Sequence, residues 1–454
     1  MSSRTVTRRK REVRKHRLSE FPYSEKDVKL AAMELGEPDW LAERRLKAWE
    51  YSRTLPMPTL KDEPWRRTDI RTLPADRLSI RQVENGTVDA ALLRPLAGDA
   101  HGSLLVVQPG QPPLVEMTQE HSEQGVVFAD WATAVKEQEA LLRTFIGQMV
   151  ADDEGKFSAL AASLARDGVL LYVPKGVDVK MPLHSVFWPA GAEAGFFSRL
   201  LVVVDNGASV TYVHEAASPS EGEGEAMHAG IVEIYVGEGA NLTFVEVQNL
   251  GKHVWNFTHE RARVEKDGRL DWIFGGVGSH LTKNFTEIDL IGQGAEGRMS
   301  GFYFADGVQH LDHDTQQNHM APNTTSDLLF KGALVGRSRS VWQGMIYVAQ
   351  DAQNTDGYQA NRNLVLSKDA RADSIPGLEI LADDVRCTHG ATIGQLEEEP
   401  IFYLMSRGLT RPQAERLMID GFFAPIMERI PFEGVRERFK GMIDSKLSTL
   451  SSGI

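Results

Sequence analysis

The chain has 454 residues, of which 42% are hydrophobic and 25% charged, as in an ordinary globular protein with room for two or three domains. No apolar run reaches the ~18–20 residues of a membrane span, and the basic start does not resemble a secretory signal. The single cysteine excludes an internal disulfide framework and fits a reducing, cytoplasmic location.

The net charge of −13 is unevenly distributed along the chain. Residues 1–17 carry eight Lys or Arg and one Glu, a net charge of +7, which leaves −20 on the remainder. This segment has no aromatic residues or apolar periodicity, so residues 1–20 are predicted to form a disordered basic tail. The acidic body of the chain argues against nucleic acid as its main partner.

Residues 21–166 are predicted to form a mixed α/β region. Two amphipathic helical segments lie between Ser24 and Thr54 and are separated at Gly36–Pro38. Further along this region, short strands are expected at Leu104–Gln108 and Gly125–Phe128, and helices at Asp130–Gln148 and Lys156–Arg166.

Residues 167–395 are predicted to form a β-rich core. Runs rich in Val, Ile, Tyr and Phe alternate with similar turn phrases, such as VDNGASVTYV and VGEGANLTFV. Five such phrases centre on Gly176, Gly207, Gly239, Gly268 and Gly294, with spacings of 31, 32, 29 and 26 residues. A repeated strand–turn–strand unit of this length indicates a stacked solenoid, and the glycines suit turns with positive φ. A β-sandwich remains an alternative, because regular turn signals serve both folds.

A cluster of metal-ligand residue types lies between His310 and His319. Strand alternation places His310, Asp312 and Asp314 on one face, and His313 and His319 on the other. A single strand therefore offers no compact ligand set, and we favour a polar outer face with packed histidines over a metal site.

Residues 396–454 are predicted to form a helical domain. The last helix carries an apolar stripe, and the preceding one contains a group of four apolar residues. Exposed members of that group are candidate anchors for a partner protein, namely Phe422, Phe423, Ile426 and Met427.

The transition from core to helices contains Cys387 and, two residues later, His389. Residues i and i+2 of a strand share a face, so a thiolate and an imidazole here could converge on one metal. On chemistry alone, a lone cysteine is more often a small buried hydrophobe. A conventional iron–sulfur cluster takes about four thiolates, so this chain could not hold one by itself.

This stretch, ADDVRCTHGATIGQLEEEPIFYLMSRGL at residues 382–409, closely resembles the SufD subunit family of the SUF iron–sulfur cluster assembly machinery. The preceding residues 348–381 resemble the same family, as does the entry segment at residues 38–70, so the resemblance covers about residues 38–450. It implies a right-handed parallel β-helix core flanked by the N-terminal α/β region and the C-terminal helices.

The resemblance also implies a non-enzymatic role. SufD-like chains pair with a SufB-like scaffold subunit, and both bind a SufC-like ATPase, here expected at the C-terminal helices. The implied cofactor is iron or an iron–sulfur cluster, transient and shared with SufB, with His389 the stronger candidate ligand and Cys387 the less certain one. SufB-like chains carry a glutamate-bearing segment and a further core cysteine that this chain lacks. Homodimer formation without SufB stays open.

No phosphate-binding G-x-x-x-x-G-K-[ST] motif occurs, which argues against ATP hydrolysis by this chain. No carboxylate spacing identifies an acid/base pair. Because parallel β-helices also host polysaccharide lyases and hydrolases, a carbohydrate-active enzyme is the alternative function at the level of fold.

Overall fold

The computed structural model describes residues 20–80, 87–97, 102–220, 222 and 224–451. The predicted basic tail, apart from its last residue, lies outside the described residues. None of the helices in this described part is long and apolar enough to cross a membrane.

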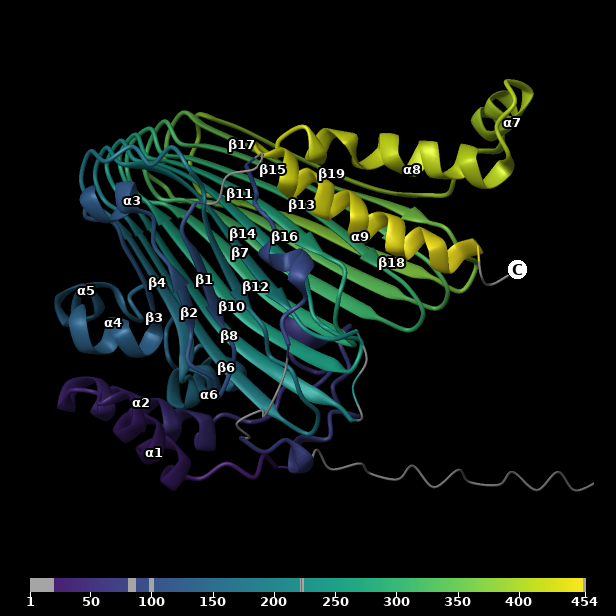
Figure 1. Ribbon diagram of the computed structural model, residues 1–454. Coiled ribbons are helices and arrows are strands. Elements are labelled where there is room, and N and C mark those ends of the chain that lie inside the picture. The colour runs from purple at the N-terminus through teal and green to yellow at the C-terminus, as the bar shows by residue number, and fades with distance from the viewer. Residues whose placement is uncertain (1–19, 81–86, 98–101, 221, 223, 452–454) are drawn as a thin grey trace, which may run out of the picture.

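The core is a parallel β-solenoid that spans residues 167–394, so the predicted solenoid is confirmed and the β-sandwich alternative is wrong (Figure 1). Odd-numbered strands from β5 to β19 build one sheet and even-numbered strands from β4 to β18 build the other, making about eight coils in the described chain. The strands are β4 (Asp167–Val173), β5 (Leu183–Phe187), β6 (Gly195–Val204), β7 (Ser209–Ala217), β8 (Ala226–Val236), β9 (Asn241–Asn249), β10 (Val254–Val264), β11 (Arg269–Gly276), β12 (Leu281–Leu290), β13 (Glu296–Ala305), β14 (His310–His319), β15 (Thr325–Leu334), β16 (Arg339–Val348), β17 (Thr355–Val365), β18 (Arg371–Ile380) and β19 (Val385–Gly394).

The repeated glycine-containing segments form the turns that connect the two sheets within a coil. Gly176, Gly207 and Gly239 adopt φ values between 63° and 70°, where a side chain would be strained. Each of their backbone N–H groups donates to a carbonyl of the next coil, which stacks the turns in register. In the fourth phrase the positive φ falls on Asp267 instead of Gly268.

Alternate residues of every strand point between the two sheets and fill the interior of the solenoid. The apolar side chains of this interior include those of Val202, Ile234, Phe244, Trp272 and Leu290, which are all buried. Each coil thereby covers the apolar face of its neighbour, as the repeat period predicts. The coil made of β18 and β19, here called the terminal coil, has such a neighbour on one side only.

The N-terminal elements cover the outer face of the even-numbered sheet and extend both sheets with short strands (Figure 1). They are α1 (Glu25–Leu35), α2 (Asp39–Thr54), β1 (Leu104–Val107), β2 (Leu114–Glu116), α3 (Gln119–Glu123), β3 (Val127–Asp130), α4 (Trp131–Glu137), α5 (Glu139–Phe145) and α6 (Lys156–Leu164). The single helix expected at Asp130–Gln148 is wrong. It divides at Gln138, whose φ of −124° leaves the helical region.

The C-terminal helices are α7 (Glu398–Ser406), α8 (Arg411–Met427) and α9 (Glu433–Ser451). Helices α8 and α9 lie along the outer face of the odd-numbered sheet, whereas α7 projects beyond it (Figure 1). Phe423 and Phe439 pack their rings against Phe302 of β13, with ring centroids 5.6 and 4.8 Å away. The helices are thus part of the folded core and not a freely attached domain.

Candidate functional site

The terminal coil leaves one edge of each sheet without a partner strand in the described chain. Strand β19 pairs with β17, strand β18 pairs with β16, and both sheets end there. A row of unpaired backbone N–H and C=O groups on a long edge strand is a ready template for another strand. Each strand of the terminal coil therefore has backbone hydrogen-bonding groups without a partner strand on one side, whereas the strands of the other coils have a partner strand on both sides.

Cys387 and His389 both lie on β19 and face the interior side of the coil, as the i, i+2 spacing predicts. In the parallel register, Cys387 sits beside Gly357 and His389 beside Gln359. Cys387 is half-buried and packs against the small apolar cluster of Ile346 and its neighbours, while His389 is exposed. The two side chains therefore lie on an interior surface that no further coil of the described residues covers.

The surroundings of Cys387 leave its sulfur in a protonated state unless a metal replaces the proton. Partial burial raises the pKa of the Cys387 thiol, and only the backbone N–H of Gly357 acts to lower it. No group of three or more His, Cys, Asp and Glu side chains in the described ranges is arranged to hold a metal ion. A metal at Cys387 and His389 would therefore need ligands from outside these residues.

The terminal coil also exposes apolar side chains that other coils bury. Leu378 and Ile380 of β18 and Ile393 of β19 point to the interior side, yet 36%, 37% and 52% of their surfaces are exposed. Leu381 follows directly and is equally uncovered. Large apolar side chains gathered beside unpaired strand edges are typical of a protein–protein interface.

The cluster around His310 is a set of ion pairs and packed histidines. On the outer face, the Lys283 ammonium lies 3.0 Å from Asp312 and 2.7 Å from Asp314, while Thr68 bonds to His310 and Asp312. These contacts tie the segment around Trp65 and Thr68 to the sheet.

On the interior side, both ring nitrogens of His319 bond to hydroxyl groups. His313 stacks on Tyr303, with ring centroids 5.4 Å apart. The predicted alternation of faces along β14 is confirmed.

A second uncovered surface lies on the projecting helix α7 and on α8, which contacts it. Phe402, Tyr403 and Met405 of α7 and Leu417 of α8 are exposed, with 74% of Phe402 accessible. None of the four candidate anchors expected from sequence is among these exposed residues. Phe423 and Ile426 are fully buried against the sheet, and Phe422 and Met427 are partly buried in the same cluster.

Comparison with known proteins identifies the family. Residues 187–422 match the profile described as SUF system FeS cluster assembly, SufBD core domain, and residues 100–184 match that of the SufBD protein N-terminal region. The iron–sulfur cluster assembly protein SufD of Bacillus subtilis is 31% identical over 90% of this chain and 95% of its own length. SufB of the same organism is 30% identical over 87% of each chain, and a SufBD family protein of Staphylococcus epidermidis is 31% identical over 70% of this chain and 68% of its own length. The chain belongs to the SufBD family of SUF iron–sulfur cluster assembly proteins.

Proposed function

We propose that this chain is the SufD-like subunit of a scaffold complex, in which its terminal coil joins the equivalent coil of a SufB-like partner. The observation that carries the proposal is the uncovered interior side of β18 and β19, where unpaired strand edges, apolar side chains and two metal-ligand residues coincide. Adding a strand at each edge would satisfy the backbone and cover Leu378, Ile380 and Ile393.

In this arrangement, iron or a nascent cluster is cargo held between the subunits. Cys387 and His389 would supply one thiolate and one imidazole, and the partner would supply the remaining ligands. Closure of the interface would also exclude water from the half-buried thiol. His389 is the stronger candidate because it is exposed toward the partner, whereas Cys387 already packs against its own chain.

The SufD-like assignment is supported by residue content and not by overall identity, since SufD and SufB of Bacillus subtilis are almost equally similar. Cys387 is the only cysteine of the chain, so a second sulfur-accepting cysteine must belong to another subunit. This favours a supporting, non-catalytic role. The family match favours this reading over a carbohydrate-active enzyme.

The helices α7 and α8 are the proposed contact for a SufC-like ATPase. Phe402, Tyr403 and Met405 are exposed on α7, which projects from the solenoid, and Leu417 is exposed on α8 (Figure 1). Most interface energy resides in a few such anchors. Removing residues 397–454 is a poor test, because it would also uncover Phe302 and Phe304 of the core.

The test of the subunit interface is Ile393→Asp, which places a carboxylate where the partner's coil would pack. We expect binding of the SufB-like partner, measured by analytical ultracentrifugation, to weaken by at least about 2 kcal/mol, roughly 30-fold. The matched control is Met33→Asp, because Met33 is 72% exposed on α1, far from the terminal coil in sequence. Equal binding by both variants would rule out this interface.

The test of the ATPase contact is Phe402→Asp. We expect loss of co-purification with the SufC-like ATPase and retained binding of the SufB-like partner, because Phe402 lies on α7 and not on either strand of the terminal coil. Met33→Asp again serves as the control. Retained ATPase binding by Phe402→Asp combined with Leu417→Asp would refute the contact.

A further inference from the structure

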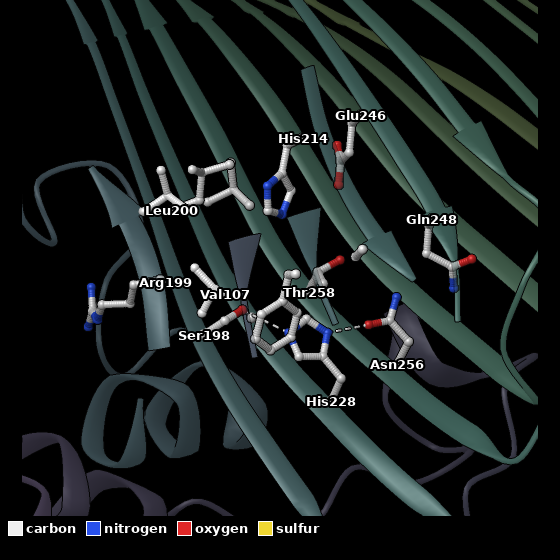
Figure 2. A pocket seen from close by; sticks show the side chains of 16 residues that line it. Val107, Ser198, Arg199, Leu200, His214, His228, Glu246, Gln248, Asn256 and Thr258 are labelled. Carbon is white, nitrogen blue, oxygen red and sulfur yellow. Dashed lines mark hydrogen bonds between the residues drawn. The ribbon is translucent and has the colours of Figure 1, made fainter. Parts of the chain in front are cut away.

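A small cavity lies inside the solenoid, among strands β1 and β4 to β10, far along the chain from the terminal coil. It measures about 30 Å³, enough for one or two water molecules, since one water needs roughly 10–15 Å³. His214, His228, Glu246, Asn256 and Thr258 line it together with apolar side chains (Figure 2). His228 is fixed by bonds of 2.8 Å to Ser198 and 2.7 Å to Asn256. A solenoid interior built only for packing needs none of these groups.

Two buried carboxyl groups meet in this region. Glu246 on β9 and Glu260 on β10 point into the interior from opposite sheets and are 7% and 2% exposed, and the charge of Glu260 contributes to the raised pKa of Glu246. A proton held on one of two neighbouring buried carboxyl groups removes the repulsion between them. The hydrogen-bond donors around the two groups are neutral: Trp272 donates to Glu246 at 3.0 Å, and Asn284 and Thr286 donate to Glu260 at 2.8 and 2.9 Å.

No cation in the described chain compensates this pair. Strand alternation places every Lys and Arg of β4 to β13 on an outer face. The Arg199 guanidinium, for example, points away from the cavity (Figure 2) and bonds to Asp152 and Glu233.

In the strands around the pair, the other titratable groups that face the interior are Tyr212 and His214 of β7, His228 of β8, Tyr303 of β13 and His313 of β14. Burial lowers the pKa of His214 and of His313 to about 3 and of His228 to about 4, so all three imidazoles are neutral near pH 7. Burial also raises the pKa of both tyrosines, which stay neutral as well. Two ionised carboxylates would therefore repel each other in a dry interior without relief.

We propose that Glu246 and Glu260 form a proton-binding pair that holds one proton at neutral pH and makes the closed solenoid interior sensitive to rising pH. When the pair loses its proton to bulk water, two carboxylates remain side by side, and the strands around them must admit water or separate. Strands β9 to β12 carry the pair and its donors, so opening would begin in the middle of the solenoid. The same proton explains why two acids tolerate burial there.

The sign of the pH dependence follows from the direction of the shifts. Burial and then the neighbouring carboxylate raise the pKa of Glu246, and burial raises that of Glu260. The folded chain thus binds more protons than the unfolded chain above about pH 4.3, the ordinary value for Glu. Stability is fully present below that pH and declines as pH rises through the folded pKa. The unfolding equilibrium constant should rise by up to about tenfold per pH unit.

The test compares urea unfolding of the full chain at several pH values from 6 to 9. We expect Glu246→Gln to flatten the pH dependence, because its amide can donate to Glu260 without a titrating proton. Glu238→Gln is the matched control, since Glu238 lies exposed in the turn before β9 and should leave the wild-type slope unchanged. An unchanged slope in Glu246→Gln would overturn the proposal.

A second readout does not depend on any variant folding. The wild-type chain at neutral pH should show the infrared C=O stretch of a protonated carboxyl group, shifted in D₂O and lost at alkaline pH. Glu260→Gln, where folded, should lack the same band. Absence of the band from the wild-type chain would equally overturn the proposal.

Discussion

The docking of the C-terminal helices on the solenoid predicts a large effect for Phe423→Ala. Phe423 is 1% exposed, and its ring centroid lies 5.6 Å from that of Phe302 and 6.3 Å from that of Phe304. Truncating a buried Phe to Ala costs about 3–5 kcal/mol, from lost apolar burial and from the cavity that remains. Because Phe423 contacts the sheet from the middle of the cluster on α8, most of this cost should appear as local opening of α8 and α9.

Amide hydrogen exchange measures this opening directly. At about 1.4 kcal/mol per tenfold, protected amides of α8 should exchange roughly 10²–10³-fold faster in Phe423→Ala, while β9 to β12 stay protected. The control is Phe402→Ala, because Phe402 is exposed on α7 and its truncation should change stability by no more than about 0.5 kcal/mol. Equal exchange in the two variants would refute the docking of α8 through Phe423.

Two further predictions concern the solenoid itself. Lys283→Met leaves Asp312 and Asp314 without the fully buried ammonium between them, and it should lower the free energy of unfolding by about 3–5 kcal/mol. In urea denaturation, adding Asp312→Asn should recover part of this loss. No recovery would show that the unpaired charge is not the cause of the loss. Gly292→Ala would place a Cβ on the backbone nitrogen of Lys266 and should prevent stable folding, whereas the Cβ of Gly441→Ala in α9 meets open space, so that variant should be tolerated. Circular dichroism melts of the two variants test this difference. A normal melt for Gly292→Ala would contradict the close stacking of neighbouring coils at this turn.

Much of the solenoid was predictable because its signals are local. The turn phrases around Gly207 and Gly239 repeat once per coil, and period-2 alternation correctly placed His310 and His313 on opposite faces. The same rule placed Cys387 and His389 together. Alternation does not show which coil is last. The exposure of Ile393 therefore follows only from the order in which the coils stack, with β19 at the end of its sheet.

The features that the sequence does not show have a common physical origin. A group of apolar residues on a helix predicts that a face is covered, but not by what, so the sequence does not show that Phe423 packs on β13. The sequence does not single out Glu246 and Glu260, because each stands in an ordinary strand pattern. Counting two residues from the buried Phe244 would have placed Glu246 on the interior face, yet its meeting with Glu260 depends on the pairing of two sheets.

The measurement that tests the central claim most directly is anaerobic iron and sulfide analysis of the complex reconstituted with wild-type SufB-like and SufC-like partners. His389→Ala should keep the complex intact, because it removes no large apolar contact, and should lower bound iron and sulfide; Cys387→Ser should lower them less. Thr388→Ala is the matched control, since Thr388 lies between them on the opposite face of β19. Full iron and sulfide content in the His389→Ala, Cys387→Ser double variant, with the complex intact, would contradict the claim that the terminal coil supplies ligands.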